Sequence, residues 1–215
     1  MSDSFRMQNV EVTWLGHASF KIKDLRSGLV AYVDPYVLPL GAEKADLIFL
    51  THGHYDHCDA GKIDEIWKDG CQIIGTQKCS TLLKKPVKIV GDNSFLVMKG
   101  IRFQTIPSYN PMKPYHPKGF GVGYVINFDK VTLYHAGDTD LISEMKLLAG
   151  KVTIALLPIG GNYTMDESEA AEAVSMIKPK VAIPMHFGKV VRGDPSRFKS
   201  LVAGQGTEVV LLQHK

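Results

Sequence analysis

The segment His52–His57 constrains this chain more than any other. It reads His-Gly-His-Tyr-Asp-His and directly follows the apolar run Leu47–Leu50 and a threonine. Side chains alternate in direction along a strand, so His52 and His54 are expected to point the same way, while Gly53 leaves room for a close approach. Imidazole and carboxylate groups are ligands for zinc and its first-row neighbours. The segment therefore predicts a metal site for metal-assisted hydrolysis.

The last two residues of this segment indicate a second ion. Asp56 and His57 are expected at the opening turn of a helix over Asp59–Lys68, beside the first pair of histidines. Two adjacent ions follow from this arrangement. The alternative interpretation is a surface loop with three solvated histidines. Such a loop would need neither a buried strand before it nor a glycine within it.

Two further candidate ligands follow apolar strands elsewhere in the chain. Asp138 lies just beyond an expected strand, and His186 ends the apolar run Ile183–Met185. A carboxylate at the first position would bridge two ions, and an imidazole at the second would add a ligand. Each also has a simpler interpretation, because an aspartate after a glycine is common in turns and a lone buried histidine is commonly structural.

Length and composition indicate one soluble enzyme domain. The 215 residues are 45% hydrophobic and 22% charged, enough for one substantial core, so a single domain over residues 1–215 is expected. The net charge of +3 disfavours nucleic acid as a partner. Without a bilayer-spanning apolar stretch or a signal-peptide core, the expected location is the cytoplasm, with no membrane partner. Three cysteines without paired spacing argue against a disulfide scaffold.

Strands and helices alternate along the chain. The expected strands are Glu11–Trp14, Ser19–Lys23, Leu29–Asp34, Leu47–Leu50, Gln72–Gly75, Val87–Val90, Phe95–Met98, Ile101–Ile106, Val122–Phe128, Lys130–Tyr134, Thr153–Leu157, Val181–Met185 and Glu208–Gln213. The expected helices are Asp59–Lys68, Gln77–Lys84, Ile142–Leu148, Met165–Ile177 and Pro195–Leu201. Thr164 and Glu167 form a capping-box pattern at the start of the helix Met165–Ile177. Two sheets, each covered on one face by helices, accommodate this order.

These residues together resemble a known superfamily. The resemblance lies in the ligand series His52, His54, Asp56, His57, Asp138 and His186, and in the runs Trp14–Ala18, Val33–Pro35, Tyr134–Thr139 and Pro158–Met165. The chain is similar to metallo-β-lactamase-fold hydrolases, and most similar to the branch of metal-dependent hydrolases related to L-ascorbate-6-phosphate lactonase. The similarity runs from about residue 9 to residue 213. It implies an α/β fold, a four-layer αββα sandwich of two mixed sheets flanked by helices.

The resemblance also implies the ligand set. Two divalent ions are expected at the upper edge of the sheets, zinc first, with manganese, iron or nickel as alternatives. His52 and His54 would bind the first ion; Asp56, His57 and His186 would bind the second. Asp138 would bridge the two.

The chain departs from the pattern at one position. Many relatives carry a histidine where this sequence has Asn110, and an amide oxygen is a poorer ligand than imidazole. Either the first ion is weakly held or His116 takes the place of the absent ligand. We favour His116, although a solvated loop histidine is the simpler interpretation.

The remaining candidates have supporting roles. His17, Asp34 and Asn110 are expected to surround the ligands, the first two orienting ligand imidazoles through hydrogen bonds. Asp56 would orient the attacking hydroxide, and His135 would act beside the site or as a proton donor.

Four residues are candidates for holding the substrate. Gly161 and Asn162 precede a helix whose backbone N–H groups and dipole would hold an anionic group, unless they merely reverse the chain. Lys113 and Lys118 would attract a phosphate, unless they are simply solvated.

Together these expectations describe a metal-dependent hydrolase. A hydroxide held by the ions would cleave an ester, lactone or phosphodiester bond in a small anionic metabolite. The alternative is a non-hydrolytic metal-binding or sensor protein, because Asn110 leaves the ligand set incomplete. A di-iron redox centre would need a further domain, and an RNA nuclease would need a clamp domain and a basic, aromatic-rich groove. The oligomeric state is open.

Overall fold

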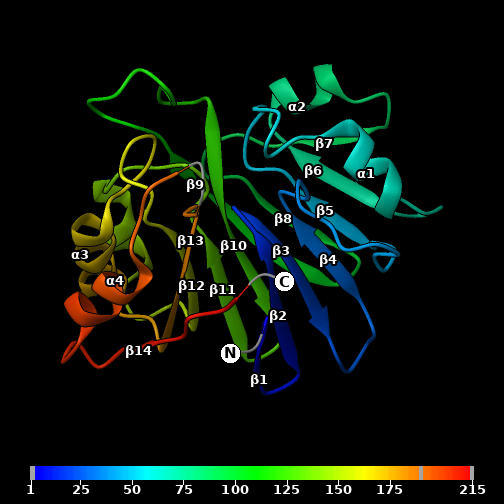
Figure 1. Ribbon diagram of the computed structural model, residues 1–215. Helices are drawn as coiled ribbons and strands as arrows, with labels where there is room; N and C mark the ends of the chain where they lie inside the picture. The colour runs from blue at the N-terminus through cyan, green and yellow to red at the C-terminus, as the bar shows by residue number, and fades with distance from the viewer. Residues whose placement is uncertain (1–2, 189–190, 214–215) are drawn as a thin grey trace.

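Two mixed sheets packed face to face form the centre of the protein, in a computed structural model that describes residues 3–188 and 191–213. Helices α1 and α2 cover the outer face of one sheet, and α3 and α4 cover the outer face of the other (Figure 1). The αββα sandwich expected from the sequence is confirmed. All three cysteine thiols are free.

The first sheet runs in chain order from one edge to the other. Its strands are β1 (Ser4–Met7), β2 (Val10–Gly16), β3 (Ser19–Asp24), β4 (Val30–Val33), β5 (Leu47–Phe49), β6 (Gln72–Gly75) and β7 (Val87–Ile89). The pairs from β1 to β4 are antiparallel, and the pairs from β4 to β7 are parallel. The short strands β4 and β5 are buried throughout, as expected for parallel strands covered on both faces.

The second sheet has the same mixed character. Its strands are β8 (Phe95–Met98), β9 (Ile101–Ser108), β10 (Gly121–Phe128), β11 (Val131–His135), β12 (Ile154–Pro158), β13 (Val181–Met185) and β14 (Glu208–Val209). The pairs from β8 to β11 are antiparallel, and those from β11 to β14 are parallel.

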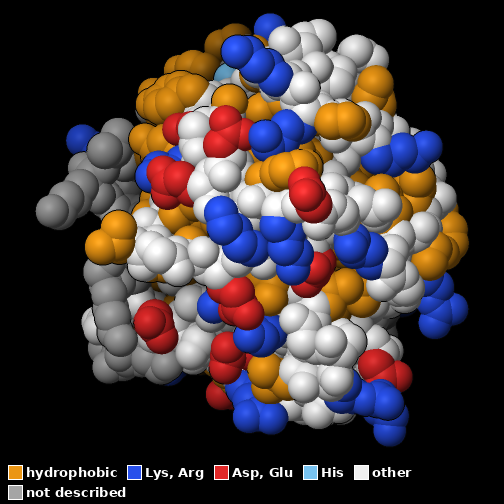
Figure 2. Space-filling view, turned by 90° about the vertical axis from the view of Figure 1, so that its right-hand side faces the viewer, with side chains coloured by type: hydrophobic (Ala, Val, Ile, Leu, Met, Phe, Trp, Pro, Cys, Tyr) orange, Lys and Arg blue, Asp and Glu red, His pale blue; other side chains and the backbone are white. Residues whose placement is uncertain are grey.

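Helices fill the connections between the parallel strands except the one from β4 to β5, which is a loop. They are α1 (Ala60–Ile66), α2 (Gln77–Leu82), the 3₁₀ helix η1 (Ser143–Leu148), α3 (Glu167–Ile177) and α4 (Pro195–Val202). None of the helices in the described part of the chain is both long and apolar enough to cross a bilayer. On the face that carries α1 and α2, lysine and arginine side chains are interspersed with aspartate and glutamate (Figure 2).

The core between the sheets follows from strand alternation. Along β2 every second side chain is buried, so Val10, Val12 and Trp14 face the opposite sheet. Phe49 of the first sheet packs edge to face against Phe103 of the second, with 5.1 Å between ring centroids. This packing fixes the two sheets against each other and so fixes the loops at their upper edge.

The longest helix begins later than the sequence suggests. The N-cap of α3 is Asp166, which accepts from the backbone N–H of Glu169 and forms the capping box with it. The expected pair of Thr164 and Glu167 is wrong, because Thr164 is buried before the helix begins. The backbone N–H of Met165 instead donates to the carbonyl of Thr139, 2.9 Å away, which anchors this turn to the loop after β11.

Smaller differences affect the ends of elements. Strand β1 was not predicted, β14 is shorter than expected, and the segment around Met145 is a 3₁₀ helix where an α-helix was expected. Asp56 and His57 lie in a turn before α1, whose N-cap is Asp59. They are therefore loop residues and lie outside the first turn of that helix.

Candidate metal centre

Five loops and turns meet at one edge of the sandwich and carry the candidate ligands. They follow β2, β5, β9, β11 and β13. Two backbone hydrogen bonds tie them across the sheets: Val122 N–H donates to Thr51, and His186 N–H donates to His17, both at 3.0 Å. Segments far apart in the sequence are thereby held against one another.

One group of three imidazoles contains His52, His54 and His116. The Nδ1 atom of His54 lies 2.9 Å from Nε2 of His52 and 3.2 Å from Nε2 of His116. Nitrogen ligands about 2.0–2.1 Å from a tetrahedral zinc ion stand roughly 3.3 Å apart, so these three atoms are spaced as ligands of one ion. The histidine expected to replace the absent ligand thus joins the first pair.

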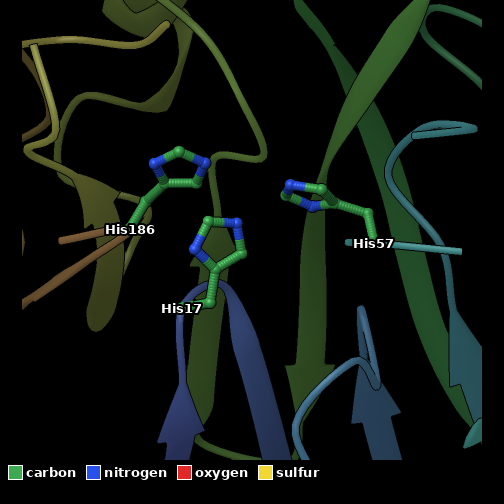
Figure 3. Close-up of side chains that lie close together, drawn as sticks. All are labelled: His17, His57 and His186. Carbon is green, nitrogen blue, oxygen red and sulfur yellow. The ribbon is translucent and has the colours of Figure 1, made fainter. Parts of the chain in front are cut away.

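A second group of imidazoles contains His17, His57 and His186. One potential ligand atom from each lies within 4.8 Å of the others. Figure 3 shows the rings of His17 and His186 side by side, facing His57 across a gap. The ring centroids of His17 and His186 are 4.1 Å apart, and those of His17 and His57 are 5.3 Å apart.

Asp138 lies between the two groups. Its Oδ2 atom is 3.0 Å from Nε2 of His186, 3.4 Å from Nε2 of His57 and 3.5 Å from Nε2 of His116. One carboxylate oxygen therefore approaches nitrogens of both groups, as a carboxylate that bridges two ions would. Its other oxygen, Oδ1, has no hydrogen-bond partner within the described residues.

Hydrogen bonds on the far side of each ring fix how the ligands present their lone pairs. The Nδ1–H of His57 donates to Oδ2 of Asp34 at 2.8 Å, which leaves Nε2 free to bind an ion. The hydroxyl of Thr51 donates to the same oxygen at 2.7 Å and therefore accepts from Nδ1 of His52 at 3.0 Å. One buried carboxylate thus orients two imidazoles.

Asn110 orients the imidazole that takes its place. Its Oδ1 atom accepts from Nδ1 of His116 at 2.7 Å and from the backbone N–H of His116 at 3.1 Å. Its amide nitrogen donates to Asp140 and to the carbonyl of Tyr163, both at 3.0 Å. The amide is therefore saturated by its neighbours, and Nε2 of His116 faces the centre.

Burial and charge set the protonation of these groups. Burial lowers the pKa of His116 to about 4 and lowers the pKa of His52 and His54. His57 is the exception: burial would lower its pKa, but Asp138 and Asp34 raise it well above the usual value. In the metal-free protein His57 is therefore protonated, and this proton supplies the positive charge that a bound cation would supply.

Several buried atoms lack partners in a way that a bound cation would remedy. Within residues 3–188 and 191–213, Nε2 of His17, Nε2 of His57 and Oδ1 of Asp138 are buried without a hydrogen-bond partner. Orphaned polar atoms are costly in a protein interior, and here they lie together at a cluster of nitrogen and oxygen donors. These residues fit divalent ions of the first transition row.

Asp56 lies at the rim of the second group. Its Oδ2 atom is 3.2 Å from Nε2 of His17, and its side chain remains 25% exposed. Burial would raise its pKa, but His17 and His57 hold it at about 2. The carboxylate is ionised at neutral pH and partly open to solvent, so it can bind a cation or accept a hydrogen bond from water.

Left-handed backbone conformations occur at three residues of the centre. The φ angles are +52° at His17, +46° at Asp34 and +54° at His186. Such conformations cost on the order of 1–3 kcal/mol each outside glycine and cluster at functional sites. The surrounding hydrogen bonds therefore hold these three residues in place against their own backbone preference.

His135 does not reach the centre. Its ring is fully buried, Nε2 donates to the carbonyl of Ala18 at 2.9 Å, and Nδ1 accepts from the N–H of Gly137 at 3.2 Å. Both ring nitrogens are used by the backbone. His135 thus ties β11 to the turn before β3, and neither of its ring nitrogens is placed to donate a proton at the centre.

The two lysines expected to attract phosphate are both engaged elsewhere. The Nζ atom of Lys113 donates to Asp140 and to the carbonyls of Gly161 and Thr164, at 2.7 to 3.0 Å. Lys118 pairs with Glu144 at 3.0 Å. The first joins the loop after β9 to the loop after β12, so its ammonium group is not free for an anion.

The loop before α3 also differs from the expected anion cradle. The backbone N–H of Gly161 donates to Met165, and that of Asn162 donates to Gly160, both at 2.9 Å. These donors are spent within the turn. A cavity of about 650 Å³ does adjoin this loop, and it is lined by Ile159, Gly160, Gly161, Asn162, Tyr163, Glu167, Val191, Arg192 and Gly193.

The glycine within the histidine segment serves packing rather than the ion. A Cβ atom on Gly53 would collide with Cγ of Lys78, and it would lie 3.5 Å from Leu82. The room that glycine provides is filled by side chains of α2. The loop can therefore lie directly on that helix, which fixes where His52 and His54 stand.

Comparison with known proteins now identifies the family. Residues 11–186 match the model of the beta-lactamase superfamily domain. The chain is 36% identical to a UPF0173 metal-dependent hydrolase of Thermoplasma volcanium, over 94% of this chain and 96% of that relative. It belongs to the UPF0173 family of the metallo-β-lactamase superfamily. It is thus a metal-dependent hydrolase.

Solved structures of two similar proteins share the fold. A protein from Parabacteroides distasonis has a TM-score of 0.89 and 30% identity, with 100% of this chain and 99% of that chain covered. The metallo hydrolase Igni18 from Ignicoccus hospitalis has a TM-score of 0.79 and 28% identity, with 95% of each chain covered. The hydrolase therefore carries its candidate centre on a fold that these proteins share.

Sequence reasoning missed three residues near the centre. Thr51 orients His52, Phe120 packs 4.9 Å from the ring of His54, and Arg192 lines the neighbouring cavity. Thr51 carried a signal, since it is the polar residue between the buried strand and the first ligand. Phe120 and Arg192 carried none, because only the folded loops bring them to this edge.

Proposed function

We propose that this hydrolase cleaves an ester, lactone or phosphodiester bond in a small anionic molecule, with two divalent ions bound, zinc first among them. The observation that carries this proposal is the position of Asp138. Its Oδ2 atom lies 3.0 to 3.5 Å from imidazole nitrogens of both groups. It thus approaches both groups, as a carboxylate shared by two neighbouring ions would.

The proposed ligands divide between two positions. His52, His54 and His116 would hold the first ion, and His57, His186 and Asp56 the second, with Asp138 shared. When bound, such ions lower the pKa of a water towards neutrality and polarise the bond to be cleaved.

Asp56 is the residue best placed to act on the attacking water. Its carboxylate is ionised, since its pKa is about 2, and it is partly open to solvent. It would orient a water by accepting its hydrogen bond. Asp34, Thr51 and Asn110 keep the surrounding imidazoles turned towards the centre.

The cavity beside the centre supports a small substrate. Gly160 lies both on its wall and against His186, because a Cβ atom there would stand 3.1 Å from Nδ1 of that histidine. A volume of about 650 Å³ is in the range of small-molecule sites. Arg192 is exposed on the wall and makes no ion pair with any described residue, so it is the proposed partner of an anionic group.

A matrix of metals and substrates tests the proposal. Metal-free protein is loaded with zinc, manganese, iron or nickel and assayed with bis(p-nitrophenyl) phosphate, p-nitrophenyl acetate and an aliphatic lactone. Turnover with one class and its loss in Asp138→Asn would support hydrolysis of that bond. Stoichiometric loading without turnover of any class would overturn the proposal.

The anionic group is tested separately. Arg192→Gln should raise KM at least tenfold for an anionic substrate and leave KM for a neutral ester unchanged. Arg197→Gln, an exposed arginine on α4 that does not line the cavity, is the matched control. Equal KM values for both substrates in both variants would remove Arg192 from the substrate site.

The alternative of a non-hydrolytic sensor loses its main support. That hypothesis depended on Asn110 leaving the ligand set incomplete, and Nε2 of His116 lies 3.2 Å from Nδ1 of His54. The relation to the lactonase branch, the cytoplasmic location, the absence of nucleic-acid and membrane partners and the oligomeric state stay predictions.

A further inference from the structure

His17 has a position that its expected role does not explain. It lies in the turn between β2 and β3, where its own φ is +52° and that of Gly16 is +116°. Its carbonyl accepts from Nε1 of Trp14 at 2.9 Å and from the N–H of His186 at 3.0 Å. Two donors thus hold a strained residue, and one of them belongs to a proposed ligand.

The ring of His17 points into the second group. Figure 3 shows it beside His186 and opposite His57. One potential ligand atom of each of these three rings lies within 4.8 Å of the others. A residue that only oriented a ligand would donate from one ring nitrogen to that ligand and lie behind it. The ring of His17 instead lies beside the rings of the proposed ligands, on the side that faces the ion position.

The hydrogen-bond partners of His17 favour coordination. Its Nε2 atom is buried without a hydrogen bond within the described residues, although Oδ2 of Asp56 is 3.2 Å away. Nε2 of His57 is orphaned in the same way. His17 and His57 thus each bring a buried nitrogen without a hydrogen bond to the group they form with His186, and the Asp56 carboxylate adjoins His17. Such a set of donors is arranged as ligands of one cation.

We propose that His17 coordinates the second ion directly through Nε2. The second position then has three imidazoles, His17, His57 and His186, together with Asp56 and the shared Asp138. The first has three imidazoles and the shared carboxylate only. This proposal rests on the two-ion centre of the proposed function and not on which bond is cleaved.

The larger donor set has a chemical consequence. Zinc in protein sites is most often four-coordinate, whereas iron, nickel and manganese accept more ligands. Five protein donors at the second position therefore favour one of these ions there and limit the zinc of the proposed function to the first position. The strained turn at His17 is the element of this chain that supplies the additional donor.

Nuclear magnetic resonance of the loaded protein tests the assignment. The chain is labelled with ¹⁵N at histidine and loaded with ¹¹³Cd, so that each coordinating ring nitrogen is split by coupling to the metal. Coupling is expected for six histidines, His17 included. A count of five, with the ring of His17 uncoupled, would overturn the proposal, and this measurement needs no variant.

Two substitutions separate coordination from positioning. His17→Phe keeps a ring beside His186 without a donor, and His17→Gln keeps a group able to donate to Asp56. Both should weaken the second ion at least tenfold in a competition titration and leave the first ion unchanged. Restoration of wild-type affinity by glutamine would mean that His17 only positions Asp56, and would overturn the proposal.

A control and the loaded wild type complete the design. Tyr36→Phe, whose ring lies 6.1 Å from that of His17, should retain both ions. Coupling of His17 to the metal without any turnover would refute the proposed function alone. Turnover with His17 uncoupled would refute this inference alone.

Discussion

Nδ1 of His57 lies 2.8 Å from Oδ2 of Asp34, and both side chains are completely buried. The same carboxylate accepts from the N–H of Thr51 at 2.8 Å and from its hydroxyl at 2.7 Å. A single anion under the centre thus sets the orientation of His57 directly and of His52 through Thr51. Asp34 directly follows β4 and has a left-handed backbone conformation, and these two features determine where its carboxylate lies.

Replacing Asp34 should therefore weaken metal binding without removing a ligand. In Asp34→Asn the charge that keeps Nδ1 of His57 protonated is lost, and we expect a 10- to 100-fold lower affinity, as for other groups that orient a ligand. A competition titration with a zinc chelator measures this. Asp64→Asn, an exposed carboxylate on α1, is the control. Equal affinities in the two variants would mean that Asp34 does not orient a ligand.

His116→Ala should remove one ion and spare the other. The side chain is buried and its Nε2 atom belongs to the first group, so the number of bound ions should fall by about one per chain. Elemental analysis of the purified variant measures the number. Lys118→Ala, in the same loop, should retain both ions. Unchanged metal content in His116→Ala would reject the replacement of the absent ligand by His116.

The sequence revealed ligands where they were contiguous or followed an apolar strand. His52–His57 could be recognised because four donors fall within six residues. Asp138 and His186 could be recognised because buried strands end beside them. In a mixed sheet, parallel strands bring their carboxyl ends to one edge. Polar residues that directly follow apolar strands can therefore be recognised in the sequence as candidates for a shared site.

The residues on long loops were harder to place. Lys113 and Lys118 had the composition of a phosphate site, but the first reaches three backbone and side-chain oxygens and the second reaches Glu144. His135 is the last residue of β11, yet its ring is buried in the core and not at the centre. The direction in which such a side chain points depends on tertiary contacts, and the local sequence pattern carries no information about these contacts.

The start of α3 illustrates the same limit at the level of an element. Thr164 with Glu167, and Asp166 with Glu169, both satisfy a capping pattern three residues apart. The structure uses the second pair, and the hydroxyl and carbonyl of Thr164 bond instead to the carbonyl of Met165 and to the ammonium group of Lys113. The long-range contact with Lys113 is not visible in the local pattern.

Gly160→Ala should weaken binding of the second ion, although Gly160 is not itself a ligand. A Cβ atom at this position would stand 2.6 Å from the carbonyl oxygen of His186 and would also meet Val191. Since contacts under 3.0 Å force a shift, we expect at least a tenfold loss of affinity for that ion and little change for the first. Gly91→Ala, where a Cβ would meet nothing within 4 Å, is the control. A two-site metal titration measures both affinities. Equal affinities for the second ion in Gly160→Ala and Gly91→Ala would contradict the prediction.

Acidification should destabilise the metal-free protein between pH 6.5 and about 4. Burial holds the pKa of His116 at about 4, against about 6.5 in an unfolded chain. Within this window the unfolded chain binds a proton that the folded chain lacks, so the free energy of unfolding falls as the pH falls. His52 and His54 shift in the same direction. The pKa of His57 is raised, so its opposite effect is felt around and above pH 6.5, where the unfolded chain loses its proton, and is small over most of this window.

Urea unfolding of chelator-treated protein at several pH values measures this dependence. His116→Gln removes one of the titrating groups. Between pH 6.5 and about 4, the free energy of unfolding should therefore fall by about 3 kcal/mol less in this variant than in the wild type, the amount expected for one buried imidazole. The comparison depends on slopes, so a general loss of stability in the variant does not disturb it. Equal slopes in the wild type and His116→Gln would show that this imidazole is protonated equally in the folded and unfolded states, and that burial does not keep it neutral for binding an ion.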